Sequence, residues 1–297
     1  MVKKKYLREG QVIKGAKVLQ FLAFGESGEV WSALTDDNNI VALKVFFKAD
    51  KDKNIAKHEY DMANRFTHEN ILKPLAISSI ESYPAILLPY CKGCSVNGVA
   101  GCFREKMIWK LIEAVSGALS EIHGKGYGHF DVKPSNILWD GKKFILSDFG
   151  ACCALDERCP EETASDSSSF RFNAPEFKTR RCSASDIWSL GATVFYLYMG
   201  CYVFNGLGGR GQHCDTPIPY MRKSLPRLSR LVQACLELNL EKRPTAEEIN
   251  SIARTEMEKL NACSPKRSLR QGQKNSEQAG NMEFWPDIMD ESIIFSE

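Results

Sequence analysis

The sequence predicts an α+β fold in two parts, a small strand-rich part followed by a larger, mainly helical part. Up to Leu88, β-branched and apolar runs alternate with turn signals and a single helical stretch. After Cys91, apolar residues recur at helical spacing. No internal repeat is visible, and a length of 297 residues suits one large domain or two lobes.

The strand-rich part is expected to begin near residue 12. Runs of β-branched and aromatic residues at 17–24, 29–34 and 40–47 predict strands. The segment Thr35-Asp-Asp-Asn-Asn39 between the last two runs predicts a hairpin turn. Charged residues at 52–66 predict one helix, and apolar runs at 71–77 and 85–88 predict two further strands.

The second part is predicted to be helical from its apolar periodicity. One buried helix face is formed by Ile108, Leu111, Ile112, Val115, Leu119 and Ile122. Gly124 follows and is expected to end this helix. Two more helices are predicted at 226–240 and 245–260, and Thr245 with Glu248 makes a capping box for the second.

Residues 187–204 form the longest apolar run, close to the ~20 residues that a membrane-spanning helix needs. Ser189, Thr193 and two glycines interrupt the run, and Asp186 stands just before it. This pattern favours a helix buried in the protein core. We therefore expect no membrane partner.

Composition and charge give an ordinary globular protein, with 43% apolar residues, 26% charged residues and a net charge of +2. This balance offers no argument for a nucleic-acid partner. The start of the chain is charged and lacks the apolar stretch of a signal peptide. Eleven scattered cysteines indicate free thiols in a reducing cytoplasm, although Cys91 and Cys94 leave a zinc site as an alternative.

Two short stretches carry the chemistry of phosphoryl transfer. The first, HFDVKPSNIL, supplies Asp131, Lys133 and Asn136, and the second, SDFG, supplies Asp148. A carboxylate can accept a proton from an attacking hydroxyl, and an ammonium can neutralise charge on a moving phosphoryl group. Amide and carboxylate oxygens are hard ligands suited to Mg²⁺.

These stretches resemble the catalytic and metal-binding loops of the eukaryotic-type protein kinase superfamily, serine/threonine type. The resemblance covers about residues 12–257 and implies a bilobal fold and transfer of the ATP γ-phosphoryl group to Ser or Thr hydroxyls of protein substrates. It makes Asp131 the catalytic base and Lys133 the stabiliser of the phosphoryl group. Asn136 and Asp148 become ligands of Mg²⁺.

The same resemblance implies a nucleotide site built from several segments. Lys44, in Val41-Ala-Leu-Lys44, would hold phosphates while paired with Glu59. Phe24-Gly-Glu-Ser-Gly-Glu-Val30 is similar to the family's glycine-rich loop, although Ala23 replaces its first glycine. Pro89 has no N–H, so Cys91 would donate to the adenine from the hinge. The implied nucleotide-binding residues are Ala23, Gly25, Gly28, Val30, Ala42, Lys44, Glu59, Leu88, Cys91, Asn136, Leu138 and Asp148.

The resemblance also gives roles to residues outside the nucleotide site. Asp186 would fix the backbone of the catalytic loop, and Glu176 would form a buried ion pair with Arg243. Ser169 matches a hydroxyl that contacts the catalytic Asp and Lys. Phosphorylation sites or an ordinary exposed polar loop are equal alternatives for Thr163, Ser165, Ser167 and Ser168.

One departure from the family pattern has a functional consequence. The family carries arginine before the catalytic aspartate, whereas this chain carries Phe130. That arginine ordinarily pairs with a phosphate on the activation segment. We therefore expect activity that depends little on such a phosphate.

The chain is predicted to divide into an extension (1–11), a kinase domain (12–257) and a largely flexible tail (258–297). Within the domain, the small lobe takes 12–88, the hinge 89–93 and the large lobe 94–257. Residues 277–297 hold six acids and no Lys or Arg, together with Phe284 and Trp285. This acidic, apolar segment is a candidate for docking on the small lobe or on a partner, with disorder as the alternative.

Two other functions compete with that of a protein kinase. Ala23 and Phe130 allow a pseudokinase scaffold that acts by binding proteins. A kinase of a small molecule is the second rival. Against it, Ala174-Pro-Glu176 and the polar segment before it resemble the part of the family that docks peptides.

Overall fold

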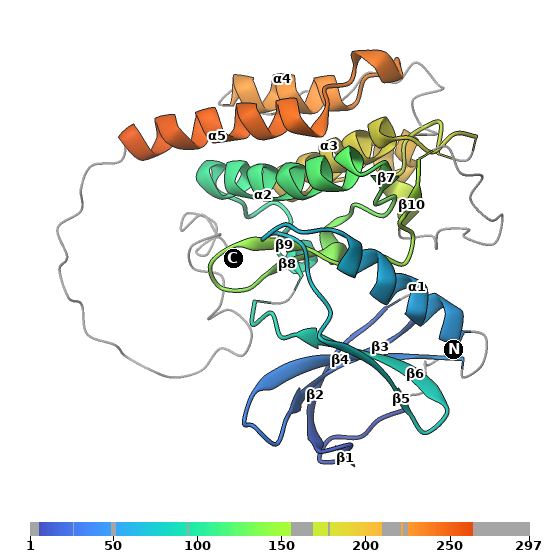
Figure 1. The fold of residues 1–297 in the computed structure, drawn as a ribbon. Coiled ribbons are helices and arrows are strands. Elements are labelled where there is room, and N and C mark those ends of the chain that lie inside the picture. The colour runs from blue at the N-terminus through green and yellow to red at the C-terminus, as the bar shows by residue number, and fades with distance from the viewer. Residues whose placement is uncertain are drawn as a thin grey trace, which may run out of the picture.

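The computed structural model describes residues 6–25, 27–48, 52–93, 95–155, 169–177, 179–209, 221 and 225–263. Two lobes are visible, a sheet with the single helix α1 (Asp52–Arg65) beside it and a larger lobe dominated by helices (Figure 1). The predicted α+β architecture is therefore confirmed.

One antiparallel sheet forms the small lobe, with strand order β1-β2-β3-β4-β6-β5. The strands are β1 (Val12–Ile13), β2 (Ala16–Phe24), β3 (Gly28–Leu34), β4 (Ile40–Phe46), β5 (Ala76–Ile80) and β6 (Tyr83–Pro89). A hairpin joins β3 to β4 at the predicted turn, where Asn38 adopts a left-handed conformation with φ 57°. Leu43 and Val45 of β4 pack on Val18 and Trp31 to form the core of this lobe.

Residues 6–11, part of the predicted extension outside the domain, pack against this sheet. Leu7 is 3% exposed and joins the small-lobe core. The fully buried carboxylate of Glu29 accepts hydrogen bonds from the backbone N–H groups of Tyr6 and Leu7 at 2.9–3.1 Å. These residues therefore belong to the folded lobe.

Long helices build the large lobe: α2 (Glu105–Gly124), α3 (Ser183–Met199), α4 (Pro226–Cys235) and α5 (Ala246–Cys263). Short strands β7 (Tyr127–Gly128), β8 (Ile137–Trp139), β9 (Phe144–Leu146) and β10 (Cys153–Ala154) pair as β7 with β10 and β8 with β9. The remaining elements are the 3₁₀ turns η1 (Val96–Val99), η2 (Pro134–Asn136), η3 (Ser169–Arg171), η4 (Val203–Gly206) and η6 (Leu240–Lys242).

The run at 187–204 falls largely in α3, which is buried along most of its length. Trp188 and Phe195 are at most 1% exposed, which confirms the prediction of a core helix. Within the described ranges, no helix combines the length and the apolar character needed to cross a bilayer.

Backbone hydrogen bonds tie the segment after α1 to the large lobe. The N–H of Leu72 donates to the carbonyl of Leu146 at 2.9 Å, and the N–H of Leu146 donates to the carbonyl of Asn70 at 2.8 Å. The side chain of Asn70 donates to the carbonyl of Phe144 at 2.7 Å. This junction brings the loop after β9 next to α1, where His58 Nε2 lies 2.8 Å from the carbonyl of Cys152. The contact positions the site described below.

Some predicted boundaries were wrong. The run at 71–77 makes only an isolated bridge at Ile71, and β5 begins after Pro74, at Ala76. The helix predicted for 226–240 ends at Cys235, and α5 continues to Cys263, past the predicted domain boundary. The predicted capping box is confirmed, since Glu248 N–H donates to Thr245 Oγ1 and Thr245 N–H donates to Glu248 Oε2.

Candidate active site

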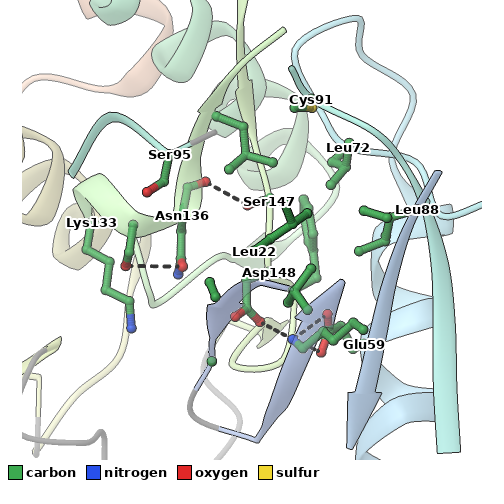
Figure 2. A pocket seen from close by; sticks show the side chains of 18 of the residues that line it. Leu22, Glu59, Leu72, Leu88, Cys91, Ser95, Lys133, Asn136, Ser147 and Asp148 are labelled. Atoms are coloured by element: carbon green, nitrogen blue, oxygen red, sulfur yellow. Dashed lines mark hydrogen bonds and ion pairs between the residues drawn. The ribbon is translucent and has the colours of Figure 1, made fainter. Parts of the chain in front are cut away.

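A buried lysine joins the two lobes of the site. Lys44 Nζ, on β4, lies 2.7 and 2.8 Å from the two carboxylate oxygens of Glu59 on α1. It also lies 3.4 Å from Asp148 Oδ1, which follows β9 (Figure 2). Three segments far apart in sequence therefore bring one cation and two carboxylates to a single point.

Burial and charge act against each other in this cluster. Burial would lower the pKa of Lys44, but the carboxylates of Asp148 and Glu59 outweigh burial and raise the pKa. Burial raises the pKa of Glu59 to about 7, against the opposing effect of Lys44. Burial would also raise the pKa of Asp148, but Lys44 and Lys133 hold it below its ordinary value. Lys44 therefore stays cationic and Asp148 anionic near neutral pH.

The catalytic-loop stretch folds into a compact polar cluster. Asp131 Oδ2 lies 2.9 Å from Lys133 Nζ and accepts a hydrogen bond from Asn136 Nδ2 at 2.8 Å. Asn136 Nδ2 also donates to the backbone carbonyl of Asp131. Lys133 and Asn136 are both 5% exposed. The carboxylate, the ammonium and the amide therefore hold one another in place.

One further residue, Asp186, fixes the backbone of this loop. The fully buried Asp186, on α3, accepts from the N–H groups of His129 and Phe130 at 2.8 and 2.7 Å. It also lies 2.9 Å from His123 Nε2 on α2. This is the arrangement that the resemblance implied for Asp186, and it ties the catalytic loop to two core helices.

His129 links the catalytic loop to the loop that carries Asp148. Burial lowers the pKa of His129, so its ring is neutral. With its proton on Nε2, the ring donates to the carbonyl of Ser147 at 3.2 Å. Nδ1 then accepts from the N–H of Asp131 at 3.3 Å. The ring also packs edge-on against buried Phe149, with 5.0 Å between the centroids.

A cleft of about 560 Å³ opens beside these groups. Leu72, Leu88 and Cys91 lie on one side of it, and Lys133 and Asn136 lie on another (Figure 2). Most of the predicted nucleotide residues line it: Ala23, Gly25, Val30, Ala42, Lys44, Glu59, Leu88, Cys91, Asn136, Leu138 and Asp148. The predicted catalytic residue Lys133 lines it as well. A cleft lined by apolar side chains with a polar, charged end suits a nucleotide base joined to phosphates.

The donor set at the charged end fits Mg²⁺. Because Asn136 Nδ2 faces Asp131, its Oδ1 remains as a hard oxygen that, among the described residues, only the Ser135 hydroxyl approaches, at 3.5 Å. The side chain of Asp148 is 33% exposed towards the cleft. Mg²⁺ commonly binds through one or two such ligands, with phosphates and water completing its shell. Among the described residues, no cluster of three or more His, Cys, Asp or Glu forms another metal site, and Cys94 lies outside them.

The family model described as "Protein kinase domain" matches residues 16–253. This chain belongs to the protein kinase family. A probable serine/threonine-protein kinase of Dictyostelium discoideum is 29% identical over 253 residues, which cover 80% of this chain and 40% of the relative. MAP3K epsilon protein kinase 1 of Arabidopsis thaliana is 29% identical over 245 residues, covering 76% of this chain and 18% of the relative.

A shorter relative is matched over most of its length. Serine/threonine-protein kinase 16 of Rattus norvegicus is 26% identical over 268 residues, covering 78% of this chain and 88% of the relative. The chain thus spans less than half of the first two relatives and most of this one.

One residue of the kinase glycine-rich loop lies differently from the expectation. Gly28 does not line the cleft but begins β3, where its carbonyl accepts from Gly25 N–H at 2.8 Å. A Cβ at Gly28 would collide with the backbone of Val45 on β4. Gly28 is therefore required by strand packing, whereas Gly25 faces the cleft.

The large lobe of the kinase contains the expected buried ion pair. Arg243 donates two hydrogen bonds to the carboxylate of Glu176, at 2.7 and 3.0 Å, and a third to the carbonyl of Ala184. Its side chain is fully buried. The two-pronged geometry anchors the Ala174-Pro-Glu176 segment to the region before α5.

Several residues that line or support the cleft of the kinase were not predicted. His129 could have been found from its place two residues before Asp131. Leu72 and Ile86 could not, since apolar residues in strands and loops give no signal of facing a ligand. The arrangement of Arg171 and Tyr202 at the cleft was also missed. Ser169 begins η3, and Thr163, Ser165, Ser167 and Ser168 lie outside the described residues.

Proposed function

We propose that this chain is an ATP- and Mg²⁺-dependent protein kinase that transfers the γ-phosphoryl group to Ser or Thr hydroxyls of protein substrates. The observation that supports this most is the convergence of Lys44, Glu59 and Asp148 beside the Asp131–Lys133–Asn136 cluster. The serine/threonine-protein kinase names of the relatives give independent support.

The chain's own residues account for each role in the reaction. Asp131 would orient the acceptor hydroxyl and take its proton, and Lys133, 2.9 Å away, would balance charge on the transferred group. Lys44, held by Glu59, would hold the phosphates. Asn136 and Asp148 would hold Mg²⁺, which when bound neutralises charge on the phosphate oxygens. Ala23, Gly25, Val30, Ala42, Leu88, Cys91 and Leu138 would enclose the nucleotide, with Cys91 N–H on the adenine.

An ATP-turnover assay with protein substrates tests this proposal. We expect Asp148→Asn to reduce kcat by about 10²–10³-fold, the scale for loss of one preorganised polar group. Asp37→Asn, at an exposed position in the turn between β3 and β4 and outside the cleft, would serve as the matched control and should keep wild-type turnover. Equal turnover of wild type and Asp148→Asn would refute the proposal. The pseudokinase alternative has no support from the site, because the side chains that face phosphate and metal are all in place.

We also propose that residues 264–297, which lie outside the described residues, dock on the small lobe or on a partner protein. The acidic, apolar composition of this tail supports the idea, and so do exposed Leu75 and Ile77, next to and within the edge strand β5. Deleting 264–297 should change activity or self-association. If neither activity nor self-association changes, the proposal is refuted.

A cytoplasmic location without nucleic-acid or membrane partners completes the proposal. The support is the near-neutral net charge of +2 and the free thiols, including exposed Cys201. Cell fractionation with a tagged full-length protein tests the location. Recovery in a membrane or nuclear fraction would contradict it.

A further inference from the structure

An arginine lies on an aromatic platform at the outer end of the cleft. Arg171, the last residue of η3, donates from Nη1 to the hydroxyl of Tyr202 at 2.9 Å. Its guanidinium carbon lies 4.7 Å from the centre of the Tyr202 ring. Both residues line the same cleft as Lys133 and Asn136. The arginine therefore belongs to the lining of this cleft.

The platform is rigid. The Tyr202 ring stacks on Tyr196 of α3, with 4.5 Å between centroids and 16° between planes. Buried Phe172 packs edge-on against both rings at 5.8 Å. Gly206 lies beside the pair, since a Cβ there would be in van der Waals contact with Arg171 Nε at 3.8 Å and with the Tyr202 ring at 3.9 Å. The guanidinium is thus held in one place before any ligand arrives.

The charge of Arg171 is left for a ligand. A guanidinium has five N–H donors, and the Tyr202 hydroxyl uses one of them. No carboxylate of the described residues forms an ion pair with Arg171, which is exposed to solvent. Lys44 is paired with Glu59, and Lys133 with Asp131. The other polar residues lining the outer end, Ser95, Asn97 and Ser135, are neutral.

We propose that Arg171, held by Tyr202, is a specificity determinant that binds an anionic group on the substrate polypeptide near the acceptor hydroxyl. The inference rests on the protein kinase activity proposed above. A carboxylate or a phosphate offers two oxygens to the guanidinium fork, and either forms charge-assisted hydrogen bonds with it. Peptides with basic residues at the same place would be repelled by the positive charge of Arg171.

Full-length protein and a positional peptide set test the inference. Each peptide carries one acceptor serine and one varied position, which lies before or after that serine. The varied position holds Glu, phosphoserine, Ala or Lys. We expect kcat/KM for Glu or phosphoserine peptides to exceed that for Lys peptides by about tenfold at one or more positions. A gain with phosphoserine alone identifies phosphate as the ligand, and a gain with both identifies any carboxylate or phosphate.

Three variants connect the preference to Arg171. Arg171→Glu should reverse it towards Lys peptides, a gain that unfolding cannot produce. Tyr202→Phe keeps the ring but loses the hydroxyl, so it should raise KM for the anionic peptides more than it lowers kcat. Arg180→Ala removes the same charge from an exposed site outside the cleft and should keep the wild-type preference.

Two results overturn the inference while the proposed function stands: a wild type that phosphorylates Glu, phosphoserine and Lys peptides equally, or Arg171→Glu with an unchanged preference. A wild type that phosphorylates no peptide or protein overturns the proposed function and this inference together.

Discussion

At Phe130, the catalytic loop carries a buried aromatic ring directly before its catalytic aspartate. The residue is 3% exposed and adopts φ 60°. Its ring occupies the space over Gly128, where any Cβ would collide with it. The guanidinium of Arg181 lies 5.8 Å from this ring and 4.4 Å from that of Phe177. Position 130 therefore contributes to the core and offers no cation to a phosphate.

We predict that activity is largely insensitive to removal of phosphate from the activation segment. Without an arginine at position 130, a phosphate there lacks the bidentate partner that the family ordinarily supplies. Turnover should change less than about twofold after phosphatase treatment, since the lost contact is absent from the start. The measurement is kcat before and after treatment, with loss of phosphate checked by mass spectrometry. A large fall in kcat would refute this prediction.

Glu59 is the second residue with a distinct expectation. It is 6% exposed, and its folded-state pKa of about 7 lies above the ordinary 4.5. The folded protein therefore binds a proton at Glu59 that the unfolded chain does not bind between pH 4.5 and 7. Stability linked to this group rises as the pH falls through that window, even though protonation weakens the pair with Lys44.

We predict that Glu59→Gln removes this dependence. As the pH falls from 7.5 to 5.5, the free energy of unfolding of the wild type should rise relative to that of the variant, by on the order of 1–3 kcal/mol. Urea unfolding at several pH values measures the difference. Exposed Glu258→Gln on α5 is the matched control and should follow the wild type. A stability difference that is constant across the pH range would show that Glu59 keeps an ordinary pKa.

At the scale of elements, the amino-terminal segment acts as a strap on the small-lobe sheet. Tyr6 packs on Tyr83 at 4.6 Å and donates from its hydroxyl to the carbonyl of Phe47 at 3.1 Å. Phe47 N–H in turn donates to the carbonyl of Ser27, in the glycine-rich loop. The buried carboxylate of Glu29 is satisfied by the N–H groups of this strap. The strap therefore supports the strands that hold the glycine-rich loop.

We predict that Leu7→Ala destabilises the protein by about 2–5 kcal/mol, because Leu7 fills the small-lobe core. The melting temperature should fall by several degrees, at roughly 2–4 °C per kcal/mol. Val12→Ala, at a position 68% exposed, is the matched control and should melt like the wild type. If the two variants melt at the same temperature, the strap does not contribute to the fold.

The sequence predicted elements best where side-chain pattern and local signals agree. The β3–β4 hairpin and the start of α5 follow from a turn sequence and a capping box, which act over a few residues. The run at 71–77 is apolar but contains Pro74, which cannot donate to a strand ladder, so β5 starts after it. Leu7 gave no signal, because its burial depends on Glu29 and on strands that follow it in the chain.

At the scale of the whole molecule, the site is made by segments that meet only in the folded chain. Lys44 and Asp148 were predicted from motifs, but their 3.4 Å approach depends on the backbone bonds between residues 70–72 and β9. The Arg171–Tyr202 pair lies outside any motif, and its residues come from η3 and the chain just before η4. Motifs thus identify residues that chemistry requires, whereas residues that adjust specificity emerge from packing.

Thiol labelling reports on this packing across the large lobe. Cys201 is exposed after α3, whereas Cys152 and Cys235 are buried. Burial raises the pKa of Cys152, and it raises the pKa of Cys235 to about 12 from an ordinary 9.0. Since the thiolate is the reactive form, both buried thiols have a much smaller reactive fraction near pH 7.5 than an ordinary thiol.

We predict that iodoacetamide labels Cys201 of the native protein at least about 100-fold faster than Cys152 or Cys235, because burial lowers both access and thiolate fraction. Peptide mapping by mass spectrometry at successive times gives the rate for each cysteine. In urea the three rates should converge, which shows that the difference belongs to the fold and not to the flanking sequence. Helices α3 and α4 pack closely at Gly191, where a Cβ would collide with the side chain of Cys235. Native labelling of Cys235 at the rate of Cys201 would therefore contradict this packing of α4 on α3.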